Sequence, residues 1–106
     1  MGTGSTYVNP ASVDWETADD GCAVRVLYEN PSRGERTLLM KLSPGACFPM
    51  HAHEGEWEQI FVLEGSFYDD QRIMKAGDFV CRSPGAPHTA GSEQGATVLL
   101  FYTRAD

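Results

Sequence analysis

The chain has 106 residues and a formal net charge of −7, from 15 acidic and 8 basic residues. A chain of this length forms one domain, and an acidic chain without a lysine or arginine run is unsuited to binding nucleic acid. The longest apolar runs, such as residues 98–102, are far too short to cross a bilayer, so no membrane partner is expected.

Short β-rich runs alternate with turn signals along most of the chain. Residues 1–20 begin with a polar, glycine-containing stretch that lacks the basic and apolar regions of a secretory signal, and we expect a flexible N-terminal lead-in. The expected strands occupy residues 23–28, 36–42, 47–53, 58–65, 72–75, 79–82, 88–90 and 96–104. No segment shows a capped, sustained helical period, so we predict an all-β sandwich or barrel over residues 21–106.

The segment 58–65 is apolar on both faces of the expected strand. Ile60 and Val62 lie on one face, and Phe61 and Leu63 lie on the other. A strand of a simple monomeric barrel would present one polar face to water. The second apolar face is therefore expected to pack on another sheet layer or on a partner subunit, and we predict a homodimer.

The three cysteines, Cys22, Cys47 and Cys81, are an odd number without the close paired spacing of a zinc site. This usage predicts a reduced, cytoplasmic chain without disulfides. Basic residues are few, and Arg36, Lys41 and Arg82 are expected at solvated surface positions.

Two of the three histidines, His51 and His53, are separated by a single residue. In a strand they would project from one face, with Cα atoms about 7 Å apart. Residues 54–57 are typical of a hairpin loop, which would make Glu58 the cross-strand neighbour of His53. Ile60 and Val62 would then continue the same face as an apolar floor. Two imidazoles and a carboxylate on one face indicate a metal ion rather than a dry core.

The third histidine, His88, follows the segment "SPGAP" at residues 83–87. Its two prolines and glycine fix the path of the chain, so this imidazole is held in place and we predict that it is a further ligand. Glu54 and Glu56 could compete with Glu58, but their loop positions favour solvated turn residues.

These spacings resemble the two motifs of the cupin family. The first motif is matched without a gap by Gly45, His51, His53, Glu58 and Gly65. The second is matched by Gly77, Gly85 and His88, with Ser83 and Ser92 in place of its first proline and its asparagine. Across residues 22–104 the chain looks most similar to the ChrR-like branch. The resemblance implies a double-stranded β-helix (jelly-roll) barrel, often dimeric, with one metal ion inside. Some members bind the metal with histidines alone, so Glu58 remains open as a fourth ligand.

A mixed nitrogen and oxygen donor set suits Fe(II), Mn(II), Ni(II) or Zn(II), and we favour Fe(II). The resemblance extends to dioxygenases that cleave small diketones, which implies a mononuclear metal enzyme acting on a diketone- or enolate-like molecule. The alternative is a non-catalytic metal-bound sensor related to the cupin domain of ChrR-type anti-sigma factors. A metal-dependent isomerase or lyase is less favoured, because few charged side chains are expected to face inward.

No catalytic residue is expected beyond the four candidate metal ligands. The substrate pocket is expected to involve Cys47, Ile60, Val62 and Tyr102. Cys47 has the same strand parity as His51 and His53, although core packing is an alternative role for it.

Overall fold

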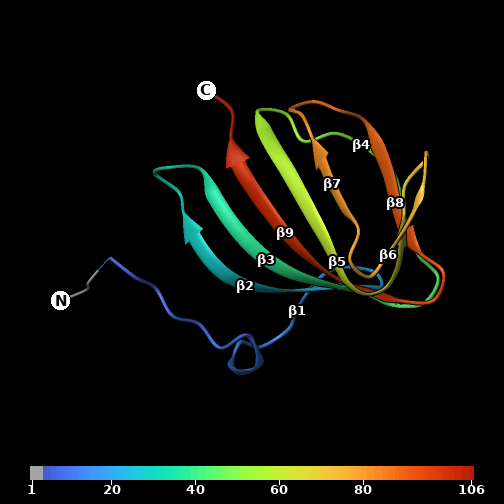
Figure 1. Ribbon diagram of the computed structural model, residues 1–106, viewed down its shortest axis with the longest axis horizontal. Coiled ribbons are helices and arrows are strands. Elements are labelled where there is room, and N and C mark those ends of the chain that lie inside the picture. Colours follow the sequence, from blue (N-terminus) through green and yellow to red (C-terminus); the bar gives the residue numbers. More distant parts are fainter. Residues whose placement is uncertain (1–3) are drawn as a thin grey trace.

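The computed structural model describes residues 4–106 and consists almost entirely of antiparallel strands (Figure 1). The strands are β1 (Glu16–Asp19), β2 (Cys22–Asn30), β3 (Glu35–Leu42), β4 (Ala46–His51), β5 (Glu56–Tyr68), β6 (Ile73–Lys75), β7 (Phe79–Arg82), β8 (His88–Ser92) and β9 (Ala96–Arg104). One short 3₁₀ turn, Pro10–Ser12, precedes them. No helix within residues 4–106 has the length and apolar character needed to span a membrane.

The strands form one curled sheet in the order β1-β2-β3-β9-β5-β8-β4, with β6 and β7 also paired to β5. Strand β5 belongs to both halves of the curl. Its first part pairs with β9 and β7, and its last residues, Ser66 to Tyr68, pair with β6. In Figure 1 the sheet folds back on itself, so that β4 and β8 face the layer of β2, β3 and β9. The predicted all-β jelly roll is confirmed.

Gly65 marks the place where β5 passes between the two halves. Its φ is +76°, a value that side chains other than glycine rarely adopt. A Cβ at this position would also collide with the backbone carbonyl of Gly95. The close approach lets the Ser66 amide donate to the Gly95 carbonyl at 3.2 Å, and this hydrogen bond joins β5 to the turn before β9.

The core lies between the two layers of the curl. Along β9 every second residue from Ala96 to Tyr102 is buried, as expected for a strand with one face inward. The largest fully buried apolar side chains are Phe67, Leu42, Leu100, Val62 and Val98. The opposite face of β5 is accessible, with Phe61 37% and Leu63 39% exposed. Segment 58–65 therefore has one apolar face in the core and one at the surface.

The expected lead-in and the expected hairpin both differ in the structure. Residues 1–3 of the lead-in lie outside the described residues, but its later part contains β1, which pairs with β2. β4 and β5 do not form the predicted hairpin: β4 pairs with β8, while β5 pairs with β9 and β7. Residues 52–55 instead connect the two halves of the curl, because β4 lies beside β8 in one half and the first part of β5 lies beside β9 in the other.

Candidate metal centre

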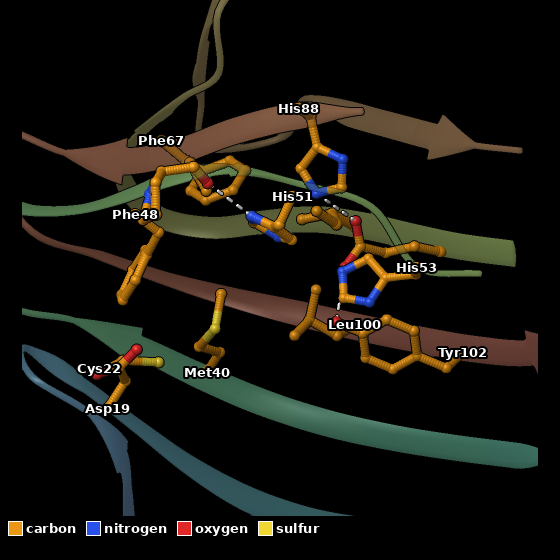
Figure 2. Close-up of a pocket in the computed structure, with 14 residues that line it drawn as sticks. Asp19, Cys22, Met40, Phe48, His51, His53, Phe67, His88, Leu100 and Tyr102 are labelled. Atoms are coloured by element: carbon orange, nitrogen blue, oxygen red, sulfur yellow. Dashed lines mark hydrogen bonds and ion pairs between the residues drawn. The ribbon is translucent and has the colours of Figure 1, made fainter. Parts of the chain in front are cut away.

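The three histidines converge inside the curl, each from a different element (Figure 2). His51 ends β4, His88 begins β8, and the register pairs these two residues across the strands. His53 comes from the connection after β4, where its carbonyl accepts a hydrogen bond from the Gly85 amide at 3.0 Å. One nitrogen of each imidazole lies within 4.8 Å of the corresponding nitrogens of the other two. The segment 83–87 therefore contacts the backbone of His53 and the ring of His88.

Backbone carbonyls fix the orientation of two of the rings. Nδ1 of His51 lies 2.9 Å from the Pro49 carbonyl, and Nδ1 of His88 lies 3.0 Å from the Ala86 carbonyl. A carbonyl only accepts, so each Nδ1 carries a proton, and in the neutral ring each Nε2 then presents a lone pair. Burial lowers the pKa of His88, and the nearby Arg82 cation lowers it further against the opposing effects of the Ala86 carbonyl and Glu58. Neutral imidazoles with oriented Nε2 atoms are the form that binds metals, so this donor set fits a metal ion.

Glu58 borders the histidine cluster but is not one of its three members. Its Oε2 lies 3.2 Å from Nε2 of His53, and its Oε1 lies 3.5 Å from Nε2 of His88. The carboxylate is buried, with 5% of its side chain exposed. The contact with His53 arises across the interior of the curl, not from the cross-strand pairing expected for a hairpin. Glu58 can therefore serve as a fourth donor or as an acceptor beside the metal.

Two further residues bind Glu58, because the strand register aligns them with it. Tyr102 on β9 and Arg82 on β7 are the register partners of Glu58 on either side. The Tyr102 hydroxyl donates to Oε2 at 2.6 Å, and Nε of Arg82 donates to Oε1 at 3.2 Å. Burial and the neighbouring Glu58 charge raise the pKa of Tyr102, which keeps this hydroxyl protonated as a donor.

Arg82 is buried rather than solvated, which corrects the expectation for this residue. Its side chain is 10% exposed, and Nη1 donates to Asp69 at 3.0 Å. Two backbone amides, those of Gln71 and Arg72, also donate to Asp69. Although burial alone raises the pKa of Asp69, these amides and Arg82 lower it overall. The sequence did contain a signal for this burial. Arg82 lies two residues after Val80, so both side chains project from the same face of β7, and Val80 packs against the core.

A cavity of about 370 Å³ opens beside the histidines. Ile60 and Tyr102 line it, together with the apolar side chains Met40, Phe48, Phe67, Ala90 and Leu100. In Figure 2 the histidines lie at one end of this space, and Cys22, Met40 and Asp19 lie toward the other. Burial, followed by the Asp19 charge, raises the pKa of the Cys22 thiol, so this sulfur is a protonated, weakly polar wall group. The cavity therefore combines a metal-binding end with a mostly apolar body.

Cys47 and Val62 were expected in this pocket and lie outside its lining. Val62 is fully buried in the core, and Cys47 is exposed. The reason for Cys47 is a register shift in β4 between Phe48 and His51. Such a bulge adds one residue and reverses the strand parity, so Phe48 faces the cavity in place of Cys47. The bulge includes Pro49, which has no amide hydrogen to pair.

One family model matches nearly the whole chain. The ChrR cupin-like domain matches residues 3–105. A solved RmlC-like cupin from Shewanella frigidimarina is similar in fold, with a TM-score of 0.85 at 20% identity over 95% of this chain and 92% of that chain. These findings agree with the motif spacings and confirm the cupin assignment made from the sequence.

Other relatives are similar to the chain over part of their own length. It is 41% identical over 66 residues to an oxalate-binding protein of Thermotoga maritima, and 31% identical over 84 residues to quercetin 2,3-dioxygenase of Bacillus subtilis. The aligned segments cover 58% and 74% of this chain, but only 54% and 25% of those proteins. The anti-sigma factor ChrR in complex with SigE from Rhodobacter sphaeroides aligns with a TM-score of 0.74 at 27% identity, covering 90% of this chain and 51% of that chain. The match over residues 3–105, together with the curled sheet and the three clustered histidines, shows that the chain belongs to the ChrR cupin-like domain family.

Proposed function

We propose that this protein is a mononuclear metal enzyme of the dioxygenase type, acting on a small diketone- or enolate-like molecule. The observation that carries the proposal is the convergence of three imidazoles at one end of a mostly apolar cavity of about 370 Å³. His51, His53 and His88 would hold the ion, and Glu58 would be its fourth ligand. Nitrogen and carboxylate donors suit Fe(II), Zn(II), Ni(II) and Mn(II) alike. We favour Fe(II), because the proposed reaction consumes dioxygen.

The bound ion would supply Lewis-acid and redox chemistry toward dioxygen. The residues of the chain have a different task, which is to bind and orient the organic molecule. Ile60, Phe67 and Leu100 form walls that contact its apolar body and exclude water. An anionic oxygen pair at the head of the molecule would be directed toward the histidine end. Among the described residues no lysine or arginine lines the cavity, and its wall away from the histidines is mostly apolar, so we infer an apolar body rather than a sugar or a short dicarboxylate.

The reaction proposed for a β-diketone consumes one dioxygen and breaks one carbon–carbon bond. Both oxygen atoms enter the products, which are a carboxylic acid and an α-dicarbonyl compound. The similarity to quercetin 2,3-dioxygenase over 74% of this chain supports this reaction class. The similarity covers only 25% of that protein, so its own substrate is not transferred.

The experiment is an oxygen-electrode assay on protein purified without oxygen and loaded with one equivalent of Fe(II). A panel of β-diketones and phenolic ketones is added, and dioxygen consumption is compared with loss of the organic compound. We expect equal amounts of each to be consumed, and no turnover by His51→Ala. A fully loaded protein that consumes no dioxygen with any member of the panel contradicts the proposed activity.

A second candidate is a metal-bound sensor that binds a small ligand without turnover. The observation that favours it is the 27% identity with ChrR, which is an anti-sigma factor in complex with SigE. The sensor would be supported by catalytic silence of the loaded protein combined with recovery of one stable protein partner. Turnover of a diketone by the wild-type protein but not by His51→Ala would exclude it.

We also propose that the protein is a homodimer and that its surface on the outer side of β5 and β7 forms the contact. Phe61 and Phe79 are register partners there, and they are 37% and 55% exposed, with Leu63 beside them at 39%. Exposed apolar groups of this kind mark interaction surfaces. Light scattering should give twice the 11.6 kDa chain mass. Phe79→Glu should yield the monomer, whereas Ile73→Glu, at a 70% exposed position on β6, should not. A wild-type monomer at micromolar concentration contradicts this proposal.

We also propose a reducing, cytoplasmic compartment. The three cysteines, Cys22, Cys47 and Cys81, are an odd number without the close paired spacing of a zinc site, and disulfides are rare where glutathione keeps thiols reduced. Treatment with a thiol reagent after denaturation should modify all three residues in protein extracted from cells under conditions that block oxidation. Recovery of a disulfide would contradict the compartment.

A further inference from the structure

A row of hydrogen-bonded polar side chains crosses three strands behind the histidine cluster. It runs from Tyr102 on β9 through Glu58 on β5 to Arg82 on β7, and it ends at Asp69, which directly follows β5. The successive distances are 2.6 Å, 3.2 Å and 3.0 Å. Each contact joins a donor to a carboxylate oxygen, so the row is a continuous chain of charge-assisted hydrogen bonds.

Stability alone does not account for this row. The side chains of Glu58, Asp69 and Arg82 are only 5%, 7% and 10% exposed. Burying an ion pair is often no more favourable than burying apolar residues of the same size. Arg82 also leaves its buried Nη2 without a hydrogen-bond partner among residues 4–106. Such an arrangement beside a cluster of metal-ligating side chains points to a role in the site.

The geometry around Glu58 shows what that role is. Oε1 accepts from Arg82 on one side and faces Nε2 of His88, at 3.5 Å, on the other. Oε2 accepts from Tyr102 and faces Nε2 of His53 at 3.2 Å. Each oxygen thus has one fixed donor and one side directed at the cluster. Rotation of the carboxylate away from the histidines would break both hydrogen bonds.

We propose that Arg82 is a positioning residue of the centre: held by Asp69, it fixes the Glu58 carboxylate so that it faces the nitrogens of His53 and His88 and joins them as a metal donor. This inference rests on the proposed metal centre. Arginine suits the task because its planar guanidinium donates from Nε to Glu58 and from Nη1 to Asp69 at the same time. Lysine has a single nitrogen on a flexible stem and does not reproduce that fork.

The test measures Co(II) binding to the metal-free protein by chelator competition and by the visible absorption of the bound ion. The decisive variant is the double substitution Arg82→Met with Asp69→Asn, because it removes the buried arginine without leaving Asp69 as an unpaired buried charge. Loss of a residue that orients a ligand typically weakens metal binding by about 10- to 100-fold. We expect that loss in the double variant, with a Co(II) spectrum that approaches the spectrum of Glu58→Gln.

Two further variants separate positioning from a general effect on folding. Adding Arg82→Met and Asp69→Asn to Glu58→Gln should weaken Co(II) binding no further. The carboxylate that Arg82 positions is already absent from the Glu58→Gln protein. Asp69→Asn alone keeps the arginine and should have a smaller effect than the double variant. Circular dichroism of each metal-free variant checks that the fold is retained.

Wild-type Co(II) affinity and spectrum in a folded double variant would overturn the inference while leaving the metal centre intact. Equal weakening by the double substitution in wild-type and Glu58→Gln backgrounds would overturn it as well, because it would show an effect independent of Glu58. If the wild-type protein binds no Co(II), the centre itself fails, and the inference fails with it.

Discussion

Substitution of Arg82 by methionine should destabilise the metal-free protein strongly, because this cation lies between two buried carboxylates. Its contacts to Glu58 and Asp69 are 3.2 and 3.0 Å long. Removing one partner of a buried ion pair costs about 3–5 kcal/mol. We expect the lower end, about 3 kcal/mol, because Asp69 keeps two backbone donors and Glu58 keeps Tyr102. For a domain of this size that loss corresponds to a fall in Tm of about 12 °C.

The assay is urea unfolding followed by circular dichroism, with Arg33→Met as a matched control. Arg33 forms an ion pair with Glu35 at 3.4 Å, but the two side chains are 71% and 33% exposed. Exposed pairs contribute about 1 kcal/mol or less, so the control should be nearly neutral. The double substitution Arg82→Met with Asp69→Asn should recover part of the loss. If Arg82→Met costs no more than Arg33→Met, the buried-pair reasoning is wrong.

Three other predictions concern the centre and the fold. Zn(II) at 100 times its Kd should stabilise the wild-type protein by about 2.7 kcal/mol in a thermal or urea titration. His51→Ala should show no such gain. Equal gains in both proteins would contradict the site. Asp69 has a folded-state pKa lowered from 3.8, so its contribution is present above that value and is lost as the pH falls through the folded-state pKa. The stability advantage over Asp69→Asn should therefore stay constant well above pH 3.8 and shrink as the pH falls below that value, and a difference that stays constant into the acid range would contradict it. Gly65→Ala should lower the free energy of unfolding by about 2 kcal/mol or more, and clearly more than Gly45→Ala. Both glycines have positive φ, but of the two only Gly65 lacks space for a Cβ. Equal costs would contradict the close approach of β5 to Gly95.

The fold was predictable because its determinants are local. Alternating apolar residues, as in 96–104, and frequent turn signals were sufficient to indicate a sheet closed on itself. The motif spacings identified the family and predicted as metal ligands the three histidines that the structure places together. The contact between His53 and Glu58 was anticipated, but for the wrong reason. Local sequence does not show which strand pairs with which, so the connection at 52–55 looked like a hairpin.

The positions missed by sequence reasoning depend on non-local geometry. A one-residue bulge in β4 reversed the parity on which the expectation for Cys47 depended and brought Phe48 to the cavity. Arg82 looked like a surface residue, since a basic side chain is seldom buried without a partner. Its partners, Glu58 and Asp69, are 24 and 13 residues away in sequence, and only the pairing of β5 with β7 brings them together.

The central claim is that three imidazoles from β4, β8 and the connection after β4 hold one divalent ion. Its most direct test is the metal content of anaerobically prepared protein after loading with Fe(II) and removal of free ion. The account predicts one equivalent per wild-type chain, loss of most of the metal in His88→Ala, and a smaller loss in Glu58→Ala. Retention of a full equivalent by His88→Ala, the most buried of the three histidines, would contradict it.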